Sequence, residues 1–153
     1  MDDLPVILKD SREKDDHGYN FIASANCAGM EVIKLDYGDY AIKGHLNLIT
    51  IERKKTVTEL CLNLGKNRNR FIAEIERMVR AGCKRKYVVV EDYYSSIFNQ
   101  RFSKIPPNTL LESINSLSLK YNIHFIFAGN KAMAHKIVRS LLLKAYKYRD
   151  VIV

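Results

Sequence analysis

The sequence has few of the features that mark secreted, disulfide-bonded or membrane proteins. Its three cysteines, Cys27, Cys61 and Cys83, form no Cys-x-x-Cys pair, and their odd number argues against a framework of disulfides. No stretch approaches about 18 consecutive apolar residues, so we expect no membrane-spanning helix. The start of the chain carries acids where a signal peptide carries basic residues, so we expect none. These points predict an intracellular protein with reduced cysteines.

Nothing in the sequence divides the chain into separate parts. It has 153 residues, the usual length of one domain, and it contains no stretch of proline or glycine long enough to serve as a linker. We find no internal repeat and no low-complexity segment. We therefore expect a single domain over residues 1–153, long enough to bury a hydrophobic core.

Acidic residues are outnumbered by basic ones. Lys plus Arg number 25 and Asp plus Glu 17, which gives a net charge of +8. This excess favours a polyanionic partner, through Coulomb attraction and counterion release. Six cations flank one predicted helix, and they form either a solvated surface or, as we favour, a surface that grips the phosphates of DNA without reading its bases. They are Lys66, Arg68, Arg70, Lys84, Arg85 and Lys86.

Apolar patterns alternate between strand and helix periods along the chain, which predicts an α/β domain with a mixed or largely parallel sheet. We expect Thr56 and Asn130 to cap helices, and Thr109 with Glu112 to form a capping box. The expected strands cover residues 5–10, 30–37, 45–54, 86–92 and 122–129, the expected helices 19–29, 56–64, 70–82, 108–121 and 130–146, and a loop 93–107.

The end of the third expected strand carries acids and a lysine. Side chains alternate along a strand, so Glu52 and Lys54 point to one face of the sheet and Arg53 to the other. If the second and third strands pair as a hairpin, Asp39 comes close to Glu52. Two neighbouring carboxylates repel unless a cation lies between them, and such oxygen ligands suit Mg²⁺ or Mn²⁺. The alternative is an exposed strand edge with a solvated salt bridge.

Four motifs in order resemble the XPF-type structure-specific nuclease family. They are Asp-Ser-Arg-Glu at 10–13, Gly-Asp at 38–39, Glu-Arg-Lys at 52–54 and Gly-Lys-Asn-Arg-Asn-Arg-Phe at 65–71. The resemblance extends over nearly the whole chain. It implies a restriction-endonuclease-like fold, in which helices flank a central mixed sheet. It also implies an Mg²⁺-dependent endonuclease, active with Mn²⁺ as well, that acts as a homodimer on branched, flap or junction DNA.

The resemblance assigns roles by position. Asp39 and Glu52 would ligate the metal, Lys54 would be the catalytic lysine, and Asp10 would be a further acid of the metal site. Arg53 would support the site from behind. One position departs from the family pattern, because the aspartate expected four residues after the lysine is replaced by Thr58.

The chain lacks the helix-hairpin-helix module on which substrate choice in this family depends. It resembles the compact stand-alone members of phages and mobile elements, which implies a bacterial or phage-infected cell. Thr58 favours an alternative, a catalytically silent DNA-binding or scaffold subunit of the same fold, whereas the intact Gly-Asp and Glu-Arg-Lys motifs favour an enzyme. A second alternative is a protein-interaction domain whose charge serves solubility. The apolar helix at 130–146 is the expected dimer surface.

Overall fold

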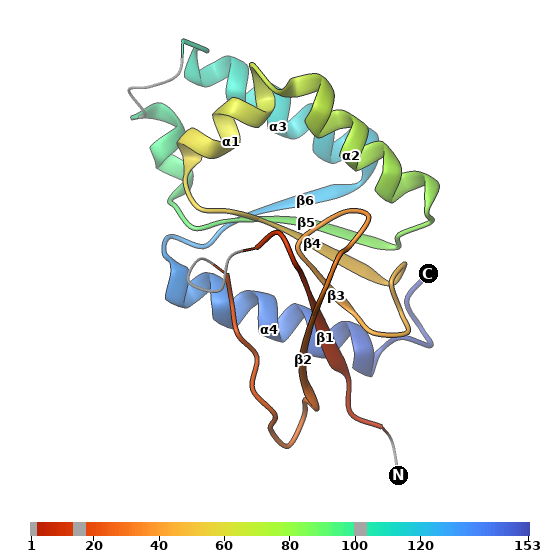
Figure 1. The fold of residues 1–153 in the computed structure, drawn as a ribbon. Coiled ribbons are helices and arrows are strands. Elements are labelled where there is room, and N and C mark those ends of the chain that lie inside the picture. Colours follow the sequence, from red (N-terminus) through yellow and green to blue (C-terminus); the bar gives the residue numbers. More distant parts are fainter. Residues whose placement is uncertain (1–2, 14–17, 100–103) are drawn as a thin grey trace.

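A computed structural model describes residues 3–13, 18–99 and 104–153, which form a six-stranded mixed sheet with helices on both faces (Figure 1). The strand order is β2-β1-β3-β4-β5-β6. β1 is parallel to β2, β3 is antiparallel to both of its neighbours, and β4, β5 and β6 are parallel. The predicted α/β class is confirmed. The strands are β1 (Val6–Asp10), β2 (Gly29–Ile33), β3 (Tyr40–Ile42), β4 (Ile49–Lys54), β5 (Arg85–Val90) and β6 (Ile123–Phe127).

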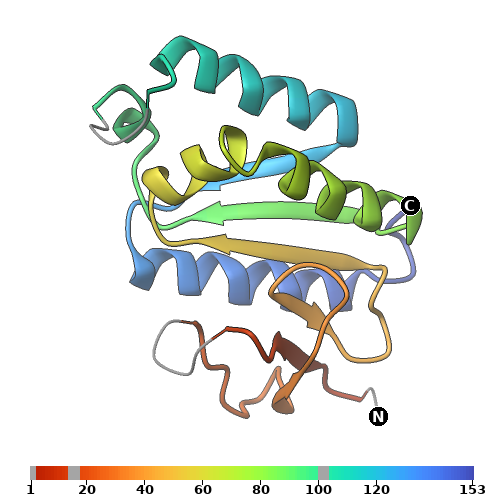
Figure 2. The ribbon, with the colours of Figure 1, turned by 45° about the horizontal axis from the view of Figure 1, so that its top comes forward.

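Three α-helices cover one face of the sheet, and α4 covers the other (Figures 1 and 2). Because side chains alternate along a strand, neighbouring residues serve different cores. Val88 packs among the residues of α1, α2 and α3, whereas Val89 packs among those of α4. None of the helices in the described ranges is long and apolar enough to cross a membrane. The helices are α1 (Val57–Leu64), α2 (Arg68–Arg80), η1 (Tyr94–Phe98, 3₁₀), α3 (Pro107–Tyr121) and α4 (Lys131–Lys147).

Two of the predicted helix caps are confirmed and one is wrong. The Thr56 hydroxyl accepts a hydrogen bond from the Glu59 N–H at 3.1 Å, and the Asn130 side chain accepts one from the Met133 N–H at 2.8 Å. The capping box expected at Thr109 and Glu112 does not form. α3 begins earlier, at Pro107, where the fixed φ of proline favours the first turn.

The helix expected at 19–29 is wrong. This segment is extended, closes a short turn through the Ser24–Cys27 bridge, and enters β2 at Gly29. Tyr19 and Phe21 are both buried, and this spacing of two residues is that of an extended chain. Aromatic contacts hold the segment against the α4 face, because the Tyr19 ring stacks on Tyr40 with 5.3 Å between centroids.

The expected hairpin also has different strands. β2 lies at the edge of the sheet beside β1, so it does not pair with β4. The antiparallel partner of β4 is β3, a strand of three residues that the sequence patterns did not reveal. Because β3 begins directly after Asp39, this hairpin still brings Asp39 to β4. Residues 94–98 of the expected loop form η1, and residues 100–103 lie outside the described residues.

Candidate active site

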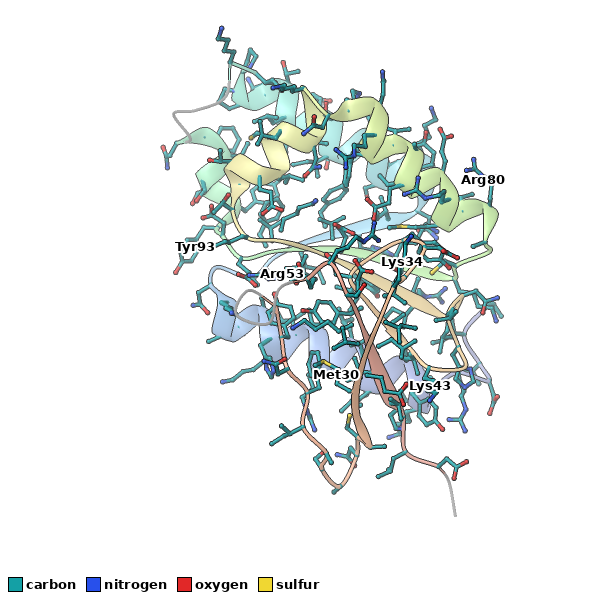
Figure 3. The ribbon with its side chains drawn as sticks, viewed as in Figure 1. Met30, Lys34, Lys43, Arg53, Arg80 and Tyr93 are labelled. Carbon is teal, nitrogen blue, oxygen red and sulfur yellow. The ribbon has the colours of Figure 1, made fainter. Side chains whose placement is uncertain are left out.

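The carboxyl end of β4 carries three consecutive charged side chains, and all six residues of the strand are buried. Glu52 and Lys54 share the face that α1 and α2 cover, as predicted. The Lys54 Nζ lies 3.3 Å from the Glu52 Oε1 and 5.5 Å from the centroid of the Phe71 ring. Arg53 points to the opposite face, toward Tyr19, and Figure 3 labels it at this end of the strand.

Asp39 is fixed to β4 by its backbone and by its side chain. Its N–H donates to the Ile51 carbonyl at 2.8 Å, and its Oδ2 accepts a hydrogen bond from the Arg53 N–H at 2.7 Å. The preceding Gly38 has a φ of +70°, and a Cβ at this position would lie 2.0 Å from the Thr50 hydroxyl. Glycine is therefore required where the chain crosses β4, which accounts for the Gly-Asp pair in the sequence.

A third carboxylate, which the sequence analysis did not identify, reaches the site from α2. The Glu74 Oε1 accepts a hydrogen bond from the Gly38 N–H at 3.1 Å, so it holds the turn that carries Asp39. Glu74 also lies close enough to Glu52 to raise the pKa of that carboxyl. One signal was present: Glu74 borders the apolar face formed by Phe71, Ile75 and Met78, which must face the sheet.

These carboxylates raise one another's pKa values. Burial raises the pKa of Asp39 to about 7, and the charge of Glu13 adds to the effect. Burial also raises the pKa of Glu52 well above its usual value, followed by the charges of Asp39 and Glu74. Burial lowers the pKa of Lys54, but the nearby carboxylates outweigh this and keep it raised. The site therefore holds more carboxyl groups than one lysine can balance as anions.

The arrangement suits a divalent cation. Glu52 is only 8% exposed, and its Oε2 is buried without a hydrogen-bond partner, which is costly for a carboxylate oxygen. No three His, Cys, Asp or Glu side chains of the described residues already converge as a metal-binding group. Mg²⁺ does not require three, because one or two carboxylates, waters and substrate phosphates usually hold it. Asp39 and Glu52 therefore fit as its protein ligands.

Asp10 is the cross-strand neighbour of Asp39, since its N–H donates to the Asp39 carbonyl at 2.8 Å. Both of its carboxylate oxygens accept hydrogen bonds, Oδ1 from the Leu35 N–H at 2.9 Å and Oδ2 from the Arg12 Nε at 2.7 Å. Asp10 thus ties the segment after β2 to the site. Its role as a metal ligand stays a prediction.

Arg53 is the centre of a buried network on the α4 face. Its guanidinium donates to both carboxylate oxygens of Glu91, at 2.7 and 3.0 Å, and lies 3.5 Å from Glu13. The Tyr19 hydroxyl donates to Glu91 at 2.5 Å. Burial lowers the pKa of Arg53, but the hydrogen bond to Glu91 and the charges of Glu91 and Glu13 together outweigh burial and raise it. Arg53 thus contacts Glu13, Glu91 and Tyr19 behind the site, and its supporting role stays a prediction.

The six cations assigned to DNA do not form one surface. α2 has 13 residues and is therefore about 20 Å long, and it separates the group that precedes it from the group that follows it. Lys66 and Arg70 are exposed near its start, on the side of the site, and Arg68 is half-buried there.

The second group lies at the amino end of β5, where Arg85 pairs with Ile49, about 16 Å along the sheet from Lys54. Lys86 is buried, and its Nζ donates to the Cys83 carbonyl at 3.3 Å. The assignment of Lys86 to a phosphate contact is therefore wrong, because its ammonium group serves the turn after α2.

The replacement of the family's aspartate by Thr58 leaves an acid nearby in another role. Glu59 accepts a hydrogen bond from the Lys55 N–H at 2.9 Å at the start of α1. Its charge also raises the pKa of Lys54. The first turn of α1 therefore still places one negative charge near the lysine, although from the next position in the helix.

The fold and this cluster of acids with a lysine define a restriction-endonuclease-like domain. A family model described as the ERCC4 domain matches residues 9–141, so the chain belongs to the ERCC4 domain family. The resemblance to XPF-type nuclease domains is thereby confirmed. A comparison with curated proteins gave no match.

Two solved structures share the fold. XPF from Aeropyrum pernix superposes with a TM-score of 0.70 at 19% identity, over 94% of this chain and 68% of that one. XPF from Aeropyrum pernix in complex with DNA superposes with a TM-score of 0.61 at 20% identity, over 94% of this chain and 66% of that one. The chain thus spans about two thirds of the length of these proteins.

Proposed function

We propose that this protein is a metal-dependent endonuclease that hydrolyses phosphodiester bonds in DNA at junctions between paired and unpaired strands. The observation that carries the proposal is the group formed by Asp39, Glu52 and Lys54, in which a buried carboxylate oxygen has no partner. Membership of the ERCC4 domain family and a fold shared with an XPF bound to DNA support the choice of substrate.

Each residue has a part that follows from its position. Asp39 and Glu52 would hold Mg²⁺, or Mn²⁺ in its place. When bound, such an ion supplies charge neutralisation at the phosphate and a lower pKa for a bound water. Lys54 stays protonated because its pKa is raised, so it donates a hydrogen bond to the attacking water or to the phosphate oxygen that gains charge. The backbone N–H of Arg53 donates the hydrogen bond that orients Asp39.

The exposed cations near the start of α2 would bind the phosphates of DNA. Lys66 and Arg70 are exposed beside the site, and contacts of this kind follow the phosphates without reading the bases. We expect binding that weakens steeply with salt. A protein-interaction domain whose charge serves only solubility would bind DNA weakly at every salt concentration.

The test is cleavage of labelled fork, flap, duplex and single-stranded DNA in Mg²⁺, Mn²⁺ or EDTA. We expect cutting that depends on the metal and that Lys54→Ala and Asp39→Asn each reduce by about a hundredfold or more. Glu76→Gln, which alters a half-buried residue of α2, is the matched control and should cut like the wild type. Cleavage that persists in EDTA, or in both variants, would contradict the proposal.

Thr58 favours a second candidate, a DNA-binding subunit that does not cut. In that case the folded protein binds forked DNA and leaves it intact in every metal. Thr58→Asp then decides the cause, because cutting gained by this variant would show that the missing carboxylate silences the site.

A further inference from the structure

A cavity lies on the α4 side of the sheet edge, behind the candidate active site. Its volume is about 500 Å³, which is within the range of small-ligand sites. Arg53, Lys55 and Lys131 bring three positive charges to its walls, and Glu91 brings one negative charge. Arg53 and Glu91 offset each other through two hydrogen bonds, so among the described residues of the lining the exposed Lys55 supplies the positive charge that favours an anion.

An exposed aromatic ring borders this cavity. The Tyr93 side chain is 62% exposed, the largest exposed fraction of any tyrosine among the described residues. It lies against Gly129, since a Cβ on that glycine would be 3.0 Å from the Tyr93 Cε1. Gly129 itself lines the cavity. Figure 3 shows Tyr93 and Arg53 at the same edge of the sheet, far from Arg80 at the end of α2.

The backbone of Tyr93 is fixed in place before any ligand arrives. The Asp92 carboxylate accepts hydrogen bonds from the N–H of Tyr93 at 2.8 Å and from the N–H of Val57 at 3.0 Å. The Asp92 carbonyl accepts one from the Gly129 N–H at 2.9 Å. One aspartate therefore links the Tyr93 turn to α1 and to the wall of the cavity. A platform held in this way loses little conformational entropy on binding.

We propose that this cavity binds one unpaired nucleotide of the DNA, with its phosphate beside Lys55 and its base stacked on Tyr93. The inference rests on the proposed function and extends it, because it names the feature of the substrate that is recognised. A base in a duplex is covered by its neighbours on both sides, so only an unpaired base offers a face to the ring. Lys54 and Lys55 are adjacent, so this nucleotide would lie next to the phosphate that is cut.

The test uses forked DNA with 2-aminopurine in the unpaired arm, next to the junction. Binding is measured in Mg²⁺ with Lys54→Ala present in every protein, so that no DNA is cut. We expect the fluorescence of 2-aminopurine to be quenched by the protein that keeps Tyr93 and also by the Tyr93→Phe variant. Tyr93→Leu should lose the quenching and bind the fork about tenfold more weakly, with less than about a twofold change for blunt duplex. Tyr148→Leu, which alters an exposed tyrosine after α4, is the matched control.

The outcomes distinguish a failure of the nucleotide site from a failure of the proposed endonuclease function. If Tyr93→Leu quenches and binds like its parent, the nucleotide site is overturned, while cleavage of the same fork by the wild type still supports the endonuclease. If Tyr93→Leu weakens fork and duplex equally, the contact does not recognise unpaired bases and the inference also fails. If the folded parent binds neither DNA, both the site and the proposed function fall.

Discussion

The two faces of β4 differ in whether their buried charges are balanced by partners of the opposite sign. On the α4 face, Arg53 is paired with Glu91 and lies near Glu13, so positive and negative groups offset one another. On the other face, Asp39, Glu52 and Glu74 gather around Lys54, and one Glu52 oxygen has no partner. The first group is balanced within the protein, whereas the second gathers more carboxyl groups than its one lysine can balance as anions.

The largest expected effect is on the paired face. Glu91→Gln leaves the Arg53 guanidinium buried without its main countercharge. We expect the free energy of unfolding to fall by about 3 kcal/mol, as measured by urea denaturation. Glu31→Gln is the control, because Glu31 also forms an ion pair, with Lys43 at 2.8 Å, but in solvent. It should cost less than about 1 kcal/mol, and equal losses in the two variants would contradict the comparison.

The second effect is the pH dependence of the unpaired face. The folded, metal-free protein keeps a proton on Asp39 up to about pH 7, whereas the unfolded chain loses it near the ordinary pKa of 3.8. The folded state therefore binds more protons between these values, and its free energy of unfolding falls as pH rises through this window. We expect a loss of about 2 kcal/mol between pH 5 and pH 7 in EDTA. Mg²⁺ should reduce that loss, and Asp39→Asn should remove most of it.

The third prediction makes the same Glu-to-Gln change on the other face of β4, where we expect the free energy of unfolding to rise and not to fall. Glu52→Gln removes a charge that has too few partners, while its oxygen still accepts the hydrogen bond from Lys54. We expect the metal-free protein to gain about 1 kcal/mol in free energy of unfolding at pH 8. Calorimetric titration with Mg²⁺ should show lost binding in the same variant. Destabilisation equal to that of Glu91→Gln would mean that the two faces do not differ.

The smallest effect is expected from Glu74→Gln. The amide oxygen of glutamine still accepts the Gly38 N–H, so the turn keeps its shape. Only the charge is lost, and we expect Mg²⁺ or Mn²⁺ to bind about three- to tenfold more weakly. Titration calorimetry measures this directly. Unchanged affinity would show that Glu74 orients the turn and adds no attraction for the cation.

The sequence was most informative where local rules govern the structure. The alternation of β4 separated Glu52 and Lys54 from Arg53, and the side chains of Thr56 and Asn130 marked two helix starts. Both rules depend only on neighbours along the chain. The motifs were equally local, and the structure brings Asp39 to the end of β4.

Contacts between distant segments decided what the sequence could not predict. Residues 19–29 have apolar spacing that also suits a helix, and packing against distant residues selects the extended form, for example that of Phe21 on His135, with 5.0 Å between centroids. β3 is too short to show a period. Three further residues come from distant segments: Glu74 from α2, Glu91 from the end of β5 and Tyr19 from the segment before β2. No motif of fixed spacing contains all of them.

The order of residues in β4 has a consequence for the evolution of chain length. Since Glu52, Arg53 and Lys54 are consecutive, a slip of one residue against β3 and β5 would exchange the two faces. An insertion within β4 would cause such a slip. The turn that joins β3 to β4 lies at the far end of the hairpin, and Gly44 there is exposed with a φ of +78° and nothing within 4 Å of a Cβ position. The spacer between the Gly-Asp and Glu-Arg-Lys motifs can therefore grow or shrink at this turn while the charges keep their sides.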